Sequence, residues 1–264
     1  TWLPMHTPNG GTDVFVDNGN IYYYGDKGWV TGSHGLYQYN TATDDWDLLQ
    51  LEINYQPILA FTGAEIWMGS SFGMWHLQNG SWTTIIMAVP PTSLAAVGTT
   101  LAGVSGNDVF YSNDNGATRL PSNLSGPGFR VFADEGEFYA ISEDKAYRSL
   151  DNGMTYNPIL TGLGTVDNLI AFTVGTNKFW LASTAYGAYQ CLQGTNDWTW
   201  VSLPNSYNDE AYLKAAGEVL FFTQAQTAFS MDYGSNWKVT NGLHKFDNFA
   251  YDVGTWYARK GLEV

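Results

Sequence analysis

The sequence predicts an all-β fold, namely a single-domain, seven-bladed β-propeller of four-stranded antiparallel blades spanning residues 1–264. Three observations support this prediction. The chain is 44% hydrophobic and 16% aromatic but only 14% charged, and its 29 glycines come without a long helical pattern. Short segments alternate between apolar and polar residues and end at glycine-containing turns. The same series of segments also recurs along the whole chain.

An aromatic or bulky residue follows the last turn of each repeat and measures its length. These markers are Trp46, Trp82, Arg119, Tyr156, Trp200 and Trp237. They are 36, 37, 37, 44 and 37 residues apart, which is the length of a four-stranded propeller blade. A helical repeat of similar length is disfavoured by the period-two alternation and by the frequent glycine turns.

Each repeat is expected to hold four short strands, named A to D in chain order, joined by hairpins. Residues 13–46 form the first full repeat. Strands B and C of the next five repeats are expected within 65–77, 100–112, 137–149, 178–190 and 219–231.

The two ends of the chain are expected to share the last blade. Residues 248–264 supply strands A, B and C, and the segment "TWLPM" (Thr1–Met5) resembles an isolated strand D such as "SWTTI". Pairing of Thr1–Met5 with this last blade would close the ring and remove an exposed sheet edge. This pairing gives the count of seven blades.

A small polar turn recurs between strands C and D. Its pattern, Ser-x-Asp-x-Gly, occurs three times, at Ser112, Asp114 and Gly116, at Ser149, Asp151 and Gly153, and at Ser230, Asp232 and Gly234. The first two copies end in Thr, whereas the third has Asn236 followed by Trp237. Aspartate accepts hydrogen bonds from nearby backbone N–H groups, and glycine takes the left-handed conformation. We therefore predict a structural role for these nine residues, without catalysis or metal binding.

The three turns, in register with the repeat, resemble the Asp-box, also called the bacterial neuraminidase repeat. Propellers of the sialidase, sortilin, xyloglucanase and photosystem-assembly-factor kind carry this motif between strands C and D. The resemblance implies a propeller along the whole chain and specifies no activity. It also implies that the B–C and D–A loops form the face that binds ligands, opposite the Asp-box turns.

Aromatic and basic residues are available on these loops to bind a partner. The predicted binding residues are Trp29, Tyr55, Phe72, Tyr186, Tyr207, Arg130 and Arg259. Flat aromatic rings beside neutral polar groups suit sugar rings or an extended peptide, and Trp and Tyr are frequent anchors of protein interfaces.

Enzymatic alternatives find less support. The resemblance implies that a sialidase would need converging arginines and a Phe/Tyr-Arg-Ile-Pro segment, but "FRVF" (129–132) lacks Ile-Pro and only Arg130 and Arg259 fall on suitable loops. A glycoside hydrolase needs only two carboxylates. Loop carboxylates such as Glu143 and Asp144 keep this alternative open. The four histidines lack metal-ligand spacing, so we expect no catalytic residues, no metal and no cofactor.

Charge and composition exclude some partners. With 11 basic and 25 acidic residues, the net charge of −14 disfavours nucleic acid. No apolar run of roughly 20 residues suggests a membrane span. The only cysteine, Cys191, is expected to be a buried small hydrophobe. Few charges, many Trp, Tyr, Asn, Gly and Thr residues, and two Asn-x-Ser sequons favour an extracellular, cell-surface or periplasmic protein.

These observations predict a non-catalytic binding module of an exported or cell-surface protein that engages a protein partner through one propeller face. A lectin-like propeller that binds an extracellular glycan is the alternative, followed by a glycoside hydrolase.

Overall fold

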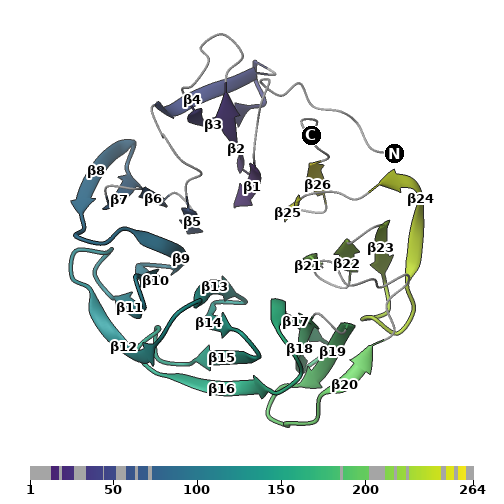
Figure 1. The fold of residues 1–264 in the computed structure, drawn as a ribbon. Coiled ribbons are helices and arrows are strands. Elements are labelled where there is room, and N and C mark those ends of the chain that lie inside the picture. Colours follow the sequence, from purple (N-terminus) through teal and green to yellow (C-terminus); the bar gives the residue numbers. More distant parts are fainter. Residues whose placement is uncertain are drawn as a thin grey trace.

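A computed structural model defines the fold of the protein (Figure 1). It describes residues 13–17, 20–26, 34–43, 45–51, 58–62, 65–70, 73–184, 187–201, 212–216, 219–223, 226–244, 248–252 and 255–259.

The described residues form six four-stranded antiparallel sheets, each made of four consecutive strands that pair in chain order. Blade 1 contains β1 (Asp13–Asp17), β2 (Asn20–Asp26), β3 (His34–Asn40) and β4 (Asp45–Leu51). Blade 2 contains β5 (Ile58–Thr62), β6 (Glu65–Ser70), β7 (Gly73–Gln78) and β8 (Ser81–Ile86). Blade 3 contains β9 (Pro91–Val97), β10 (Thr100–Ser105), β11 (Asp108–Ser112) and β12 (Leu120–Ser125). Blade 4 contains β13 (Arg130–Asp134), β14 (Glu137–Ser142), β15 (Lys145–Ser149) and β16 (Tyr156–Thr161). Blade 5 contains β17 (Val166–Val174), β18 (Asn177–Thr184), β19 (Gly187–Leu192) and β20 (Thr199–Val201). Blade 6 contains β21 (Tyr212–Ala216), β22 (Val219–Thr223), β23 (Gln226–Ser230) and β24 (Lys238–His244). The first strand of each blade lies toward the centre and the fourth at the rim (Figure 1).

A two-stranded sheet of β25 (Asn248–Asp252) and β26 (Thr255–Arg259) lies between blades 6 and 1, because β25 contacts both β21 and β1. The predicted all-β propeller is thus confirmed, but the predicted seven four-stranded blades with a closing N-terminal strand are wrong: six blades are four-stranded. The proposed closing segment, Thr1–Met5, and residues 260–264 lie outside the described residues. A five-residue likeness between strands indicates extended structure, but it does not determine which strand is the partner.

The hydrophobic core lies between neighbouring blades. One cluster joins Ile170, Phe172 and Leu181 of blade 5 to Leu213 and Phe222 of blade 6, and all five are buried. The inner strands therefore need apolar residues on both faces of the sheet. This explains the continuous apolar run "LIAF" (169–172) in β17, where all four residues are buried. Strand β8 at the rim has a mostly exposed pattern instead.

The Ser-x-Asp-x-Gly turns share one hydrogen-bond pattern. In the turn after β11, the Ser112 hydroxyl donates to Asp114 Oδ1 (2.8 Å) and accepts from the Gly116 N–H (2.8 Å), and Asp114 Oδ1 accepts from the Thr118 N–H (2.8 Å). Gly116 has a φ of 79°, in the left-handed region that favours glycine. In the third turn Asn236 replaces Thr, and its backbone N–H and its side-chain amide both donate hydrogen bonds to the carboxylate of Asp232.

These turns make the stability of the fold depend on pH. Hydrogen bonds from Thr118 and Ser112 lower the pKa of Asp114, and those from Asn236 and Ser230 lower the pKa of Asp232. For Asp151, burial raises the pKa, but hydrogen bonds from Thr155 and Ser149 outweigh it. A carboxylate with a lowered folded pKa stabilises the fold above its unfolded pKa of about 3.9, and this stabilisation is lost as the pH falls through the folded pKa. We expect the urea midpoint of unfolding to fall steeply when the pH is lowered from 5 to about 2.

The matched control for this prediction is the triple variant Asp114→Asn, Asp151→Asn and Asp232→Asn. Its urea midpoint of unfolding should be lower than that of the parent protein at pH 7. The midpoint should also fall less on acidification, because these three carboxylates no longer titrate. An acid dependence as steep as that of the parent protein would show that other groups cause it.

Candidate binding face

The strand order places the B–C turns and the D–A connections at one end of the blades, and the A–B and C–D turns at the other. The first end is called the binding face below. Hydrogen bonds tie its turns to its connections: the Val166 N–H donates to Glu143 O (2.7 Å) and the Gly126 N–H to Asn107 O (2.7 Å). The Ser105 hydroxyl donates to Val89 O (2.7 Å). These bonds hold the turns of blades 3 and 4 against the connections that enter or leave them.

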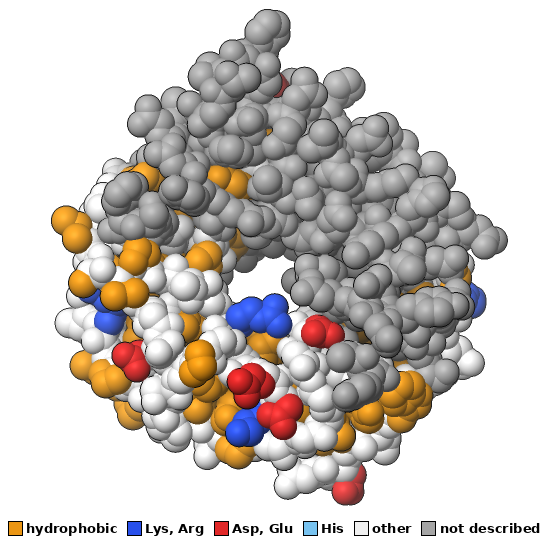
Figure 2. All heavy atoms as spheres, in the orientation of Figure 1, with side chains coloured by type: hydrophobic (Ala, Val, Ile, Leu, Met, Phe, Trp, Pro, Cys, Tyr) orange, Lys and Arg blue, Asp and Glu red, His pale blue; other side chains and the backbone are white. Residues whose placement is uncertain are grey.

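Arg130 stands at the inner edge of the binding face. It is the first residue of the inner strand β13, and its side chain is exposed. Its Nη2 donates a hydrogen bond to the carbonyl of Asp167 in β17 of the following blade (2.8 Å). This contact orients the guanidinium and leaves other N–H donors for a ligand. The space-filling view shows the central opening with a basic side chain at its edge and acidic side chains nearby (Figure 2).

Side chains of the inner strands form hydrogen bonds between neighbouring blades around this opening. The Ser93 hydroxyl donates to Val131 O (2.9 Å) and accepts from the Val131 N–H (3.0 Å). Asn168 donates to Leu213 O (3.3 Å). Because each bond joins the first strands of consecutive blades, the inner edge of the face is a rigid support for Arg130.

The structure describes two of the seven predicted binding residues. Trp29, Tyr55, Phe72, Tyr186 and Tyr207 lie outside the described residues. Arg259 is the last residue of β26 and Arg130 the first of β13, so the topology places both at the binding face. Their role in binding stays a prediction.

The described acidic residues at this face include Asp108 at the start of β11, Asp167 near the start of β17, and two neighbours in the B–C turn of blade 4. Glu143 is exposed and has a φ of 50°, and Asp144 is half-buried. The backbone carbonyls of these residues accept hydrogen bonds from Val166 (2.7 Å) and Gly162 (3.2 Å). A tight turn between β14 and β15 accounts for both residues without catalysis.

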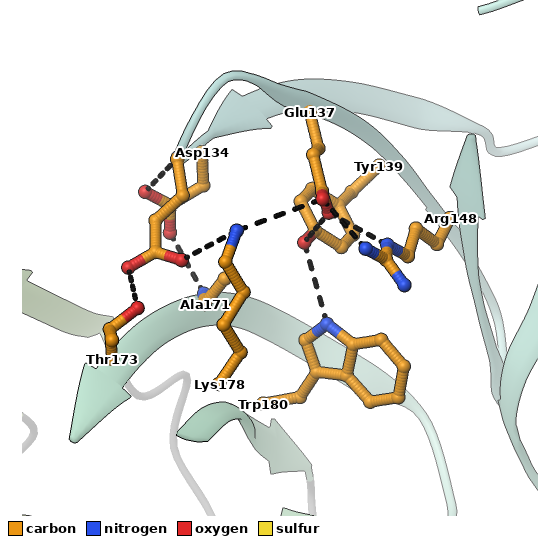
Figure 3. Close-up of polar contacts among 9 residues, drawn as sticks. Asp134, Glu137, Tyr139, Arg148, Ala171, Thr173, Lys178 and Trp180 are labelled. Atoms are coloured by element: carbon orange, nitrogen blue, oxygen red, sulfur yellow. Dashed lines mark hydrogen bonds and ion pairs between the residues drawn. The ribbon is translucent and has the colours of Figure 1, made fainter. Parts of the chain in front are cut away.

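The most strongly interacting ionic group lies at the opposite end of blades 4 and 5 (Figure 3). Glu137 accepts two hydrogen bonds from Arg148 (2.7 and 2.6 Å) and one from the Tyr139 hydroxyl (2.8 Å). The Nζ atom of Lys178 in blade 5 lies 3.8 Å from Glu137 Oε1. The Arg148 guanidinium carbon lies 5.7 Å from the ring centre of Trp180. These contacts join the two blades.

Burial raises the pKa of Glu137, but hydrogen bonds from Arg148 and Tyr139 and the charges of Arg148 and Lys178 outweigh it, so the net shift is downward. The hydrogen bonds that Arg148 donates to Glu137 raise the pKa of Arg148. A carboxylate with a lowered pKa and three protein donors is a poor general acid or base at neutral pH. Shifted pKa values mark some functional sites, but these groups satisfy one another, which is typical of a structural ion pair.

Other site types find no support in the described part of the chain. It contains no group of three or more His, Cys, Asp or Glu side chains that could hold a metal ion. The described residues include no helix that is long and apolar enough to cross a membrane. Cys191 is buried, as the sequence predicts.

The structure changes the role of one repeat marker. The Trp82 indole N–H donates to Leu49 O of the preceding blade (3.2 Å), and the Trp198 N–H makes the same contact with Ile159 O (2.8 Å). Trp198 rather than Trp200 therefore occupies the marker position in blade 5, and Trp200 is 54% exposed. The segment "NDWTW" offers two tryptophans, and spacing alone selected the wrong one.

Comparison with known proteins addresses the fold. No protein-family model and no curated protein sequence matches the chain. Among solved structures, it is similar to YCF48 bound to D1 peptide, with a TM-score of 0.70 and 15% identity over 99% of this chain and 94% of that one. It is also similar to the GH74 xyloglucanase from Xanthomonas campestris, with a TM-score of 0.67 and 13% identity over 92% of this chain and 47% of that one. A third similar structure is the extracellular domain of a hybrid two-component system from B. thetaiotaomicron (TM-score 0.65, 12% identity, 92% and 35% covered). At these identities, the likeness identifies the fold of this chain as a β-propeller.

Proposed function

We propose that this protein is a non-catalytic binding module that engages an extended segment of a protein partner through the binding face. The observation that carries the proposal is Arg130. Its exposed guanidinium is oriented by the Asp167 carbonyl at the inner edge of a face whose turns and connections are hydrogen-bonded to one another. A rigid, exposed arginine is a frequent anchor of protein interfaces, because it can donate several hydrogen bonds to backbone carbonyls or carboxylates.

Two further considerations support a binding role. Glu143 and Asp144 at the binding face belong to a tight turn, and the tightly paired Glu137 lies at the opposite end of its blade. One similar propeller, YCF48, has been solved with a bound peptide, which shows that this architecture can hold a peptide. We propose that the present chain also binds a peptide segment.

The proposal also includes the compartment and the turn family. We assign the protein to the cell surface, periplasm or extracellular space, on the basis of its low charged fraction and many aromatic residues. We assign the three Ser-x-Asp-x-Gly turns to the Asp-box type, on the basis of their shared hydrogen bonds.

A displayed library of random 12-residue peptides, selected on the purified protein, tests this function. Enriched peptides are synthesised and their affinity is measured by fluorescence anisotropy. We expect Arg130→Ala to weaken binding about tenfold or more, because a hydrogen bond to a charged group contributes about 1.5–3 kcal/mol. Higher salt should weaken binding to the parent protein as well.

Arg119→Ala is the matched control. Arg119 also donates one hydrogen bond to a backbone carbonyl, that of Gly116 (3.1 Å), but it lies at the opposite end of its blade. Its replacement should change peptide affinity less than about twofold. A library that yields no binding peptide, or equal losses in the two variants, would contradict the proposal.

A further inference from the structure

Trp200 is a surplus aromatic residue in its repeat. In blade 5 the inter-blade contact of the marker position is made by Trp198, which donates to Ile159 O and stacks on Trp180 with ring centres 6.3 Å apart. Trp200 follows two residues later in the outer strand β20 and is 54% exposed. An exposed tryptophan that its repeat does not require offers a large flat aromatic surface to a ligand.

The ring of Trp200 is held in a defined position. It pairs across the sheet with Tyr189, and the two rings are perpendicular, with centres 5.4 Å apart. Its far edge lies over Gly187, where an added Cβ would come within 2.2 Å of the indole Cη2. Gly187 has a φ of 134°, so a side chain at this position would be strained as well as in collision. The absence of a side chain at Gly187 thus makes room for the indole ring.

The chemistry of this corner suits a neutral sugar. Gly187, Tyr189 and Trp200 carry no charge at neutral pH, and the net charge of −14 disfavours anionic ligands. Within the described part of the chain, the Tyr189 hydroxyl has no hydrogen-bond partner and can bond to a ligand hydroxyl. A flat aromatic ring beside a neutral hydroxyl offers an apolar surface for the C–H face of a pyranose and a polar group for its edge.

Other occupants fit this corner less well. Strand addition at the outer edge would need a long free strand, but β20 has only three residues. A quaternary ammonium group is held best by several aromatic faces around the cation. Here two perpendicular rings form an open corner.

We propose that Trp200 and Tyr189, seated on Gly187, form a subsite for one sugar ring of a neutral polysaccharide. Gly187 begins β19 directly after the B–C connection, so the subsite lies at the outer margin of the binding face. It is separate from Arg130 at the inner edge, and it does not depend on the peptide-binding function proposed above.

Native affinity electrophoresis tests the subsite. The parent protein is run in gels that contain galactomannan, mixed-linkage glucan, arabinoxylan or dextran, and in a gel with anionic polygalacturonate. We expect at least one neutral polysaccharide to retard the parent protein. Trp200→Ala should weaken this binding at least about tenfold, and Trp200→Phe should retain part of it.

Ile86→Ala, at a site that is 82% exposed in another blade, serves as the control for loss of an exposed apolar side chain and should keep full retardation. Arg130→Ala should also keep full retardation, because Arg130 lies apart from the corner at the inner edge of the face. A parent protein that is retarded by a neutral polysaccharide but selects no binding peptide would contradict only the peptide-binding proposal. Retardation by none of the neutral polysaccharides, retardation by polygalacturonate alone, or equal retardation of Trp200→Ala and the parent would overturn the sugar subsite.

Discussion

Replacing Trp67 by alanine is expected to lower the free energy of unfolding by about 4 kcal/mol, the usual loss for truncating a large buried aromatic residue. Trp67 in β6 is fully buried and packs with Leu94, Leu101 and Phe110 of blade 3. Its ring stacks on His76 with centres 4.4 Å apart. Truncation would leave a cavity between two blades, where the core of this fold is located.

Guanidinium-induced unfolding, followed by far-ultraviolet circular dichroism, measures this loss. Trp67→Phe is the control, and it should lower the free energy of unfolding clearly less than Trp67→Ala does. It keeps most of the apolar contact, and it removes an indole N–H that is buried without a partner among the described residues. A Trp67→Ala variant within about 1 kcal/mol of the parent would show that the space between blades 2 and 3 closes after truncation.

Arg148→Met is expected to lower the free energy of unfolding by about 3 kcal/mol, because it leaves the carboxylate of Glu137 mostly buried and without its main partner. Both carboxylate oxygens of Glu137 accept hydrogen bonds from Arg148, and the two side chains are 18% and 19% exposed. Tyr139 and Lys178 remain as weaker partners. The long apolar side chain of methionine keeps much of the packing against Trp180.

A double-mutant cycle separates the charge from the packing in this cluster. Adding Glu137→Gln to Arg148→Met should recover part of the lost stability, since the unpaired charge is removed. The lowered pKa of Glu137 stabilises the parent above the unfolded pKa of about 4.3, and this contribution is lost as the pH falls through the folded pKa. Arg148→Met should therefore also flatten this part of the acid dependence. Additive effects of the two substitutions would show that they do not act as a pair.

The described residues at the two ends of the propeller differ in how their polar groups are satisfied. The A–B and C–D end contains the Ser-x-Asp-x-Gly turns and the Glu137–Arg148 cluster, where charged groups are satisfied by other residues of the chain. The binding face presents Arg130 at its inner edge and the Trp200 corner at its outer margin. Substitutions at the first end should mainly change stability, and substitutions at the second should mainly change binding.

Much of the fold could be predicted because its determinants are local. Period-two alternation reflects the pleat of a strand, and glycine at the left-handed positions fixes the turns, so each hairpin is encoded by its own residues. The turn at Ser112, Asp114 and Gly116 is a good example, because the side chains of Ser112 and Asp114 bond only to residues within six positions of each other. Repetition of such local units predicted a propeller before any long-range contact was known.

The number of four-stranded blades and the choice between Trp198 and Trp200 depended on contacts between distant segments. The two tryptophans are only two residues apart, Trp198 just before β20 and Trp200 within it, so local sequence does not distinguish them. Only the position of Ile159 in the preceding blade decides that Trp198 is held inside, and only the missing side chain of Gly187 lets Trp200 lie exposed on the sheet. The sequence by itself determined the repeat and its turns, since these rest on interactions within a few residues. The tertiary structure decided which strands complete a blade and which tryptophan is held between two blades, since these rest on how separate blades pack.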